Sequence, residues 1–145
     1  MGIIYFFICL CVLHAMITDV ICRRIYNYNS VLIIISSLSL YFYSVQFSFL
    51  IPFIVLTVGF FLFLFNVWGA GDAKFCFALT LSLPSDLMFP FFLVMSISGG
   101  GIAIFMLIFP WLRGKHIGMP YGLPIGIGYL STLYMGILNE SIIFI

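Results

Sequence analysis

Two carboxylates are the residues of this chain whose positions suggest chemistry. Only four acidic residues occur among its 145. Asp72 follows the turn Gly69-Ala70-Gly71 at the edge of an apolar stretch, and Asp19 closes an earlier apolar stretch. Glycine allows another group to approach the backbone closely. A carboxylate directly behind a glycine turn therefore suggests that something must come near it.

Two carboxylates that face each other across a partly desolvated cleft can share one proton, because both cannot ionise comfortably at contact distance. The charged member can then take a proton from water. The neutral member can donate a hydrogen bond to a carbonyl oxygen and later a proton to the leaving amine. This is aspartic-protease chemistry, which needs no metal or cofactor, and the two aspartates permit it. Which of them starts as the base stays open, because a coupled pair titrates as a unit.

Simple charge pairing is the alternative explanation for both aspartates. Asp19 precedes Arg23 by four residues, a spacing that pairs side chains on a helix, and Asp72 precedes Lys74 by two. The glycine turn ahead of Asp72 favours the chemical interpretation.

The composition places these carboxylates in a membrane protein. The chain is 65% hydrophobic and 6% charged, whereas soluble domains carry roughly 25% charged residues. A soluble domain of this length has too little interior to bury so much apolar surface. We expect one integral membrane domain over residues 1–145, with no nucleic-acid partner. A metal site is not expected, because the four cysteines form no C-x-x-C pair and only two histidines occur.

Apolar runs predict an all-α fold of about six transmembrane helices. The first run has no basic region before it and no small-x-small cleavage site after it, so we interpret it as a helix and not a signal peptide. The fourth run is short and is expected to include the glycine turn. Gly99-Gly100-Gly101, inside the fifth run, are expected to serve close helix packing. The six runs are 3–18, 31–45, 49–67, 73–83, 87–112 and 125–138, with polar stretches at 19–30 and 113–124 and a tight turn at 46–48.

Charge placement supports this count of helices. With six spans, all five cations fall on one face of the membrane, which the positive-inside rule makes cytoplasmic. Asp19 and Asp72 share that face, whereas Asp86, Glu140 and both termini fall outside. The cations are Arg23, Arg24, Lys74, Arg113 and Lys115.

Three segments, in order, resemble one protease family. "GAGD" at 69–72 followed by Lys74 resembles the G-x-G-D-x-K motif of GxGD-type intramembrane aspartyl proteases, specifically the type IV prepilin peptidases. "DVICRRIYN" at 19–27 resembles that family's aspartate followed by a basic pair, Ile and Asn, although Tyr26 stands where the family often has Pro. "MPYGLPIG" at 119–126 resembles the Pro-aromatic-Gly signature before the family's last helix.

The resemblance implies cleavage of a short, basic leader from prepilin-like or pseudopilin substrates, at the cytoplasmic face of the bacterial inner membrane and without a cofactor. Pilus or secretion assembly machinery is implied as a possible partner. Longer family members carry a cytoplasmic insertion with paired C-x-x-C motifs that is linked to N-methylation of the product. This chain has no such insertion and resembles the short, protease-only members of tight-adherence (Flp) pilus systems, so methyltransferase activity is not expected.

The resemblance also assigns roles to residues. Asp19 and Asp72 would be catalytic, and Gly69 and Gly71 would shape the turn. Lys74 would bias the charge of the pair or contact substrate, or else only anchor the topology. Arg23 and Arg24 are expected chiefly to set the topology beside the site, and Asn27 to bond to loop backbone. Pro120, Tyr121 and Gly122 are expected to shape a nearby loop. His14 and His116 are expected to be structural.

A different class of function also accommodates two buried carboxylates. A small transporter or pilus-assembly subunit could use them to bind a proton or cation. Transport sites usually lie near the bilayer midplane, whereas these carboxylates are predicted at helix ends beside loops, which favours the peptidase.

Overall fold

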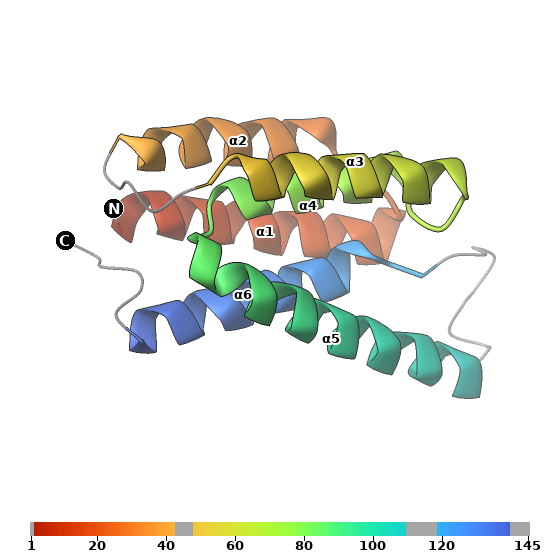
Figure 1. The fold of residues 1–145 in the computed structure, drawn as a ribbon. Helices are drawn as coiled ribbons and strands as arrows, with labels where there is room; N and C mark the ends of the chain where they lie inside the picture. Colours follow the sequence, from red (N-terminus) through yellow and green to blue (C-terminus); the bar gives the residue numbers. More distant parts are fainter. Residues whose placement is uncertain (1, 43–47, 110–118, 140–145) are drawn as a thin grey trace.

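The computed structural model describes residues 2–42, 48–109 and 119–139. These residues form six α-helices and one short 3-10 helix, without strands, which confirms the all-α expectation (Figure 1). The predicted turn at 46–48 lies mostly outside the described residues, as do Arg113, Lys115, His116 and Glu140. The helices are α1 (Gly2–Cys22), α2 (Asn27–Tyr41), α3 (Leu50–Leu64), α4 (Ala70–Leu81), η1 (Ser85–Leu87), α5 (Met88–Ile108) and α6 (Gly122–Leu138).

Helix α4 is the inner helix of the bundle. It packs against α2, α3 and α6, while α1 packs against α2 and α6, and α5 packs against α6. Most of α4 is buried, including Phe75, Cys76 and Leu79, which are fully enclosed. In Figure 1, α2 and α3 lie on one side of α1 and α4, and α5 and α6 lie on the other. Most of the length of α4 is therefore enclosed by neighbouring helices.

Glycines permit close packing at some helix contacts and not at others. A Cβ added to Gly59 would lie 2.9 Å from the Cβ of Ala73, so α3 approaches α4 closely there. A Cβ added to Gly99 would make ordinary contact with Pro124 of α6, at 3.6 Å. A Cβ on Gly100 or Gly101 would meet nothing within 4 Å. The packing role predicted for the three glycines of α5 is therefore wrong for the second and third.

The polar stretch predicted at 19–30 is shorter than expected. Helix α1 continues through Asp19 to Cys22, and α2 already begins at Asn27. Arg23 directly follows α1, and its φ of 53° lies in the left-handed region. Asn29 is buried in α2, and its amide contacts the ring of His14 in α1 at 3.0 Å. Polar residues that pack between helices were mistaken for loop residues.

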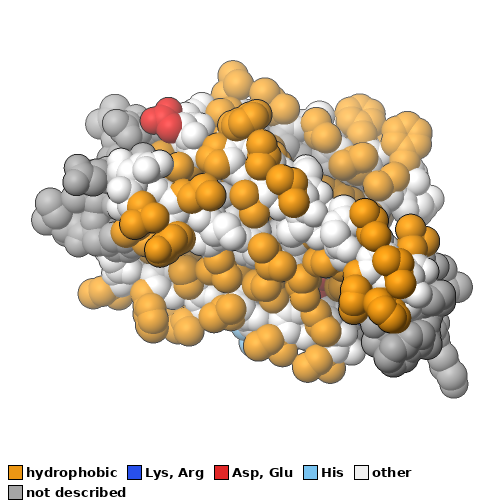
Figure 2. All heavy atoms as spheres, turned by 90° about the horizontal axis from the view of Figure 1, so that it is seen from below, with side chains coloured by type: hydrophobic (Ala, Val, Ile, Leu, Met, Phe, Trp, Pro, Cys, Tyr) orange, Lys and Arg blue, Asp and Glu red, His pale blue; other side chains and the backbone are white. Residues whose placement is uncertain are grey.

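Helix length and composition support a membrane protein. Within the described residues, Gly2–Cys22 and Ser85–Ile108 are long and apolar enough to cross a bilayer. Helices α3 and α6 are apolar but have 15 and 17 residues, which corresponds to roughly 23 and 26 Å against about 30 Å of hydrocarbon. Hydrophobic side chains cover most of the face formed by α5 and α6 (Figure 2), and soluble proteins rarely expose such large apolar patches. Two crossing helices are identified in this way, not six.

Candidate active site

Asp19 and Asp72 line the same cavity, at the end of the bundle where α1 ends and α4 begins. The cavity has a volume of about 720 Å³. The chain thus brings together two carboxylates from different helices. The cavity is lined by Asp19, Arg23, Arg24, Ile25, Tyr26, Asn27, Phe63, Asn66, Val67, Trp68, Gly69, Gly71, Asp72, Met119 and Tyr121.

The glycine turn fixes the carboxylate of Asp72. Gly69 caps the N-terminus of α4, and its backbone N–H donates to Asp72 Oδ2 at 2.9 Å. A carboxylate in the first turn of a helix is also favoured by the helix dipole. A Cβ on Gly69 would lie 3.0 Å from the same oxygen, so a side chain there would crowd the carboxylate. The turn thus orients Asp72 at the edge of the cavity.

Asp19 is held by the start of α6. Its carboxylate is buried, and Oδ2 accepts a hydrogen bond from the backbone N–H of Gly122 at 2.7 Å. A Cβ on Gly122 would lie 2.9 Å from that oxygen and 3.0 Å from the Cβ of Asp19. Only glycine allows this approach without displacement. Gly122 was expected to shape a nearby loop, but its direct bond to Asp19 was not foreseen.

Ile25 connects the three motif segments. A Cβ on Gly71 would lie 3.4 Å from both the Cβ and the carbonyl oxygen of Ile25, and a Cβ on Gly122 would lie 3.0 Å from its Cδ1. The segment after α1 therefore passes close to the first turns of α4 and α6. The left-handed backbone at Arg23 directs the chain into this path. The sequence indicated Ile25 only as part of a motif.

The three cations that the structure describes, Arg23, Arg24 and Lys74, lie at the same end of the bundle. Arg23 and Arg24 line the cavity. Lys74 Nζ lies 3.5 Å from Asn27 Oδ1, at the start of α2, and donates a hydrogen bond to it. The ammonium of Lys74 is thus engaged by an amide that was expected to bond loop backbone. Pairing with Lys74 does not account for the position of Asp72, which is bonded to the glycine turn.

Sequence reasoning predicted Tyr121 near the site but missed the other aromatic and apolar residues of the cavity wall, among them Phe63, Trp68 and Met119. Trp68 lies directly before the glycine turn, and its ring centroid is 6.2 Å from that of Tyr121. Asn66 takes a φ of 56° after α3, and Met119 precedes Pro120. The position of Trp68 beside the glycine turn was the one signal that could have indicated its role. His14 is not among the lining residues and joins α1 to α2 instead.

Each carboxylate has one oxygen engaged and one available. Oδ2 of Asp19 and Oδ2 of Asp72 both accept backbone N–H groups. Among the described residues, Oδ1 of neither carboxylate has a protein hydrogen-bond partner. The cavity that both line has room for a water and a substrate backbone. The arrangement suits activation of a water by one carboxyl group and protonation of a leaving group by the other.

The fold and the site define a class, a helical membrane protein with two carboxylates in an open cavity. Comparison with known families shows to which family within this class the chain belongs. A family description for the type IV leader peptidase family matches residues 6–104, which contain both aspartates. The chain belongs to this family, and the prediction of a prepilin peptidase relative is confirmed. Membership implies a protease of the leader-peptidase type. No curated protein and no solved structure matches the chain.

Proposed function

We propose that the protein is an intramembrane aspartic endopeptidase. It removes the short basic leader from type IV prepilin-like substrates, of the Flp or pseudopilin kind, at the cytoplasmic face of the bacterial inner membrane. The observation that carries the proposal is that Asp19 and Asp72 line one cavity, each oriented by the N–H of a glycine. Family membership supplies the protease class.

Hydrolysis requires one carboxylate and one carboxylic acid. The ionised member takes a proton from water, and the resulting hydroxide oxygen bonds to the carbonyl carbon of the scissile peptide. The protonated member donates a hydrogen bond to the carbonyl oxygen. When the tetrahedral intermediate collapses, the C–N bond breaks and a proton from the pair passes to the leaving amine. The products are a carboxylate on the leader and an amine on the mature chain.

The distribution of charge supports the proposed orientation. Arg23 and Arg24 line the cavity, and Lys74 bonds to a residue that lines it. Asp86 is an exposed residue of η1, between α4 and α5, and the junction of these two helices lies at the opposite end of the bundle (Figure 1). By the positive-inside rule, the cavity end faces the cytoplasm. We propose six crossings with both termini outside, in which the shorter helices cross with help from local thinning of the bilayer.

The decisive experiment is a cleavage assay with purified enzyme and a synthetic prepilin segment. Asp19→Asn and Asp72→Asn should each lower the rate by about 10³-fold or more, because general acid–base catalysis contributes up to about 10⁴-fold. Asp86→Asn is the matched control, because it removes a carboxylate remote from the cavity. Membrane insertion of all three variants should match the unsubstituted protein. Normal processing by either active-site variant would remove that aspartate from the mechanism.

The absence of methyltransferase activity has its own test. The product of cleavage, incubated with enzyme and a methyl donor, should keep an unmodified N-terminal amine by mass spectrometry. Methylation of the product by this polypeptide would contradict the assignment to the protease-only type.

A further inference from the structure

Two apolar hollows continue the catalytic cavity along the bundle. One of about 330 Å³ lies against α5 and the start of α6, and one of about 380 Å³ lies between α3 and α5. Trp68 lines both of them as well as the catalytic cavity, and Met95 lines both apolar hollows. The three hollows therefore adjoin one another at these residues, and we name the series the α3/α5 groove.

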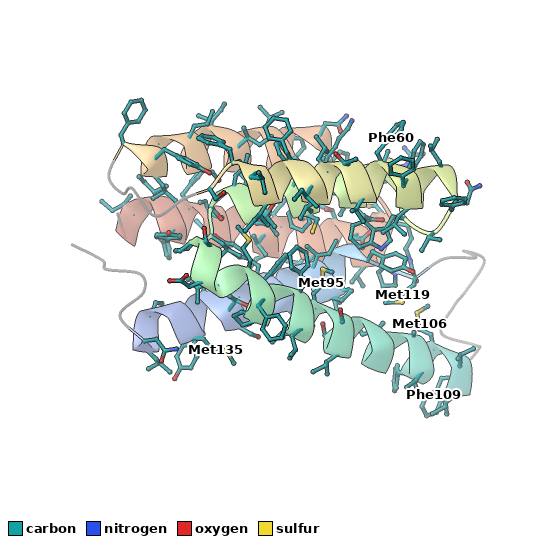
Figure 3. The ribbon with its side chains drawn as sticks, viewed as in Figure 1. Phe60, Met95, Met106, Phe109, Met119 and Met135 are labelled. Atoms are coloured by element: carbon teal, nitrogen blue, oxygen red, sulfur yellow. The ribbon has the colours of Figure 1, made fainter. Side chains whose placement is uncertain are left out.

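The packing of the helices explains why this groove is open. Helix α3 packs against α4, and α5 packs against α6. Two apolar walls are left facing each other, represented by Val55 and Val58 on α3 and by Phe92 and Met95 on α5. Figure 3 shows Met95 and Met119 between the layer of α3 and α4 and the layer of α5 and α6, whereas Phe60 lies on the outer side of α3.

The groove changes polarity along its length. At its catalytic end it is lined by Asp19, Asp72 and two arginines. In the hollow between α3 and α5 every lining side chain is hydrophobic, from Ile51 to Leu62 on the α3 side. These positions cover roughly 16 Å of helix, about three turns. A bound chain would therefore need a polar segment at one end and an apolar segment of about three turns next to it.

We propose that the α3/α5 groove binds the apolar helix of the substrate and thereby places the leader junction at the two aspartates. This inference rests on the proposed function and names the docking surface for the same substrate. The occupant follows from the polarity of the groove, because a chain that is cut at the aspartates can lie in the adjoining hollows only if an apolar segment follows the cut. An apolar helix of about three turns fits the length of the hollow between α3 and α5.

Gly100 offers a way to close the groove without disturbing the protein. It lines the 330 Å³ hollow, and a Cβ there would meet nothing within 4 Å. A larger side chain would therefore project into space that the substrate helix would occupy. Gly101 is the matched control, because its Cβ position is equally open and it does not line either apolar hollow. Both substitutions remove a helical glycine, so effects on helix stability are alike.

The test measures kcat and KM for a prepilin segment that includes its apolar helix. Gly100→Leu should raise KM at least about tenfold with little change in kcat, as expected for loss of binding alone, and Gly101→Leu should behave as the unsubstituted enzyme. Equal values for the two variants, or a fall in kcat alone for Gly100→Leu, would overturn the groove assignment. Failure of the unsubstituted enzyme to cleave would instead overturn the proposed function.

A crosslinking experiment tests the same surface without relying on turnover. In the Asp72→Asn enzyme, p-benzoylphenylalanine replaces either Ala103, which lines the groove, or Ile104, which is exposed on α5 and does not. Irradiation with the prepilin segment should give a substrate adduct from position 103 and little from position 104. Adducts only with lipid, or only with a second copy of the enzyme, would assign the groove to that occupant and reject the proposal.

Discussion

Buried or partly buried polar groups lie at both ends of the bundle, and their hydrogen-bond partners differ between the two ends. At the end near η1, the hydroxyl of Tyr5 donates to the carbonyl of Ser82 at 3.2 Å, and the hydroxyls of Ser82 and Tyr129 lie 2.8 Å apart. All three residues are buried. At the other end, Asp19 and Asp72 bond to backbone N–H groups and line an open cavity.

The difference separates polar groups that bond to one another from the two carboxylates that we propose as catalytic. The hydroxyl cluster joins α1, the end of α4 and α6, and its members bond to one another away from the cavity. Such a closed network stabilises the fold, because a buried polar group is costly only when it lacks a partner. Each carboxylate is also oriented by a backbone N–H at Oδ2, but both line a cavity that opens to the outside of the protein. Burial alone does not indicate a functional site, whereas burial with an available acceptor does.

The largest expected effect tests whether the carboxylates act as one unit. The double variant Asp19→Asn/Asp72→Asn should lose no more activity than either single variant, about 10³-fold or more, because groups that act together are strongly non-additive. The measurement is single-turnover cleavage of a prepilin segment. Losses that multiply would show that the two aspartates contribute independently.

Gly122→Ala should have the next largest effect on cleavage. The added Cβ would lie 2.9 Å from Asp19 Oδ2, so the carboxylate must turn or α6 must shift. We expect a loss of about 10²-fold in kcat/KM, since small displacements of a catalytic group have effects of this size. Gly101→Ala is the control, because its Cβ would meet nothing within 4 Å. Full activity of Gly122→Ala would mean that this contact does not position Asp19.

Tyr129→Phe, at the end of the bundle with the hydroxyl cluster, should lower stability and leave cleavage nearly unchanged, which is the opposite of the effect expected for the aspartate variants. It removes the hydrogen bond with Ser82 and should lower the free energy of unfolding by about 1–3 kcal/mol. Thermal unfolding in detergent measures the change, with Tyr134→Phe on the exposed side of α6 as the control. Cleavage by the folded fraction should change less than about twofold. A large loss of specific activity would show that the two ends are coupled.

Lys74→Met should have the smallest effect. Its side chain is exposed and bonds only weakly to Asn27, at 3.5 Å, and exposed charged contacts typically contribute about 1 kcal/mol or less. We expect a change in kcat/KM of no more than about fivefold. A loss approaching that of the aspartate variants would instead give Lys74 a direct role in setting the charge of the pair.

The sequence predicted the class of the fold and the segments that form the cavity. The segments 19–27, 69–74 and 119–126 were identified by their motifs, and family membership is confirmed. The bond between Gly122 and Asp19 was not predicted, because it joins residues 103 positions apart and depends on how α6 packs. The ends of α1 and α2 were misplaced for a related reason. Asn29 looks like a loop residue until its partner His14 is known.

The roles of the site residues stay predictions. Their positions around one cavity explain why the three motifs, which are far apart in the sequence, occur in the same chain. Composition could not show that Gly100 and Gly101 face open space, because a glycine-rich helix segment looks the same whether it meets a neighbour or a groove. Helix ends were also hidden, because α1, α2, α4 and α6 include polar or glycine residues beside the apolar runs, whereas α3 ends before its run does.

Ile25 has no chemistry of its own, yet it touches the positions where α4 and α6 both begin. One aliphatic side chain therefore acts as a spacer that sets how far apart the two reactive groups can stand. A bulkier residue at position 71 would therefore require a smaller one at position 25, whereas at position 122 it would also meet Asp19. Compensating exchanges of this kind among related sequences would record the spacer's width.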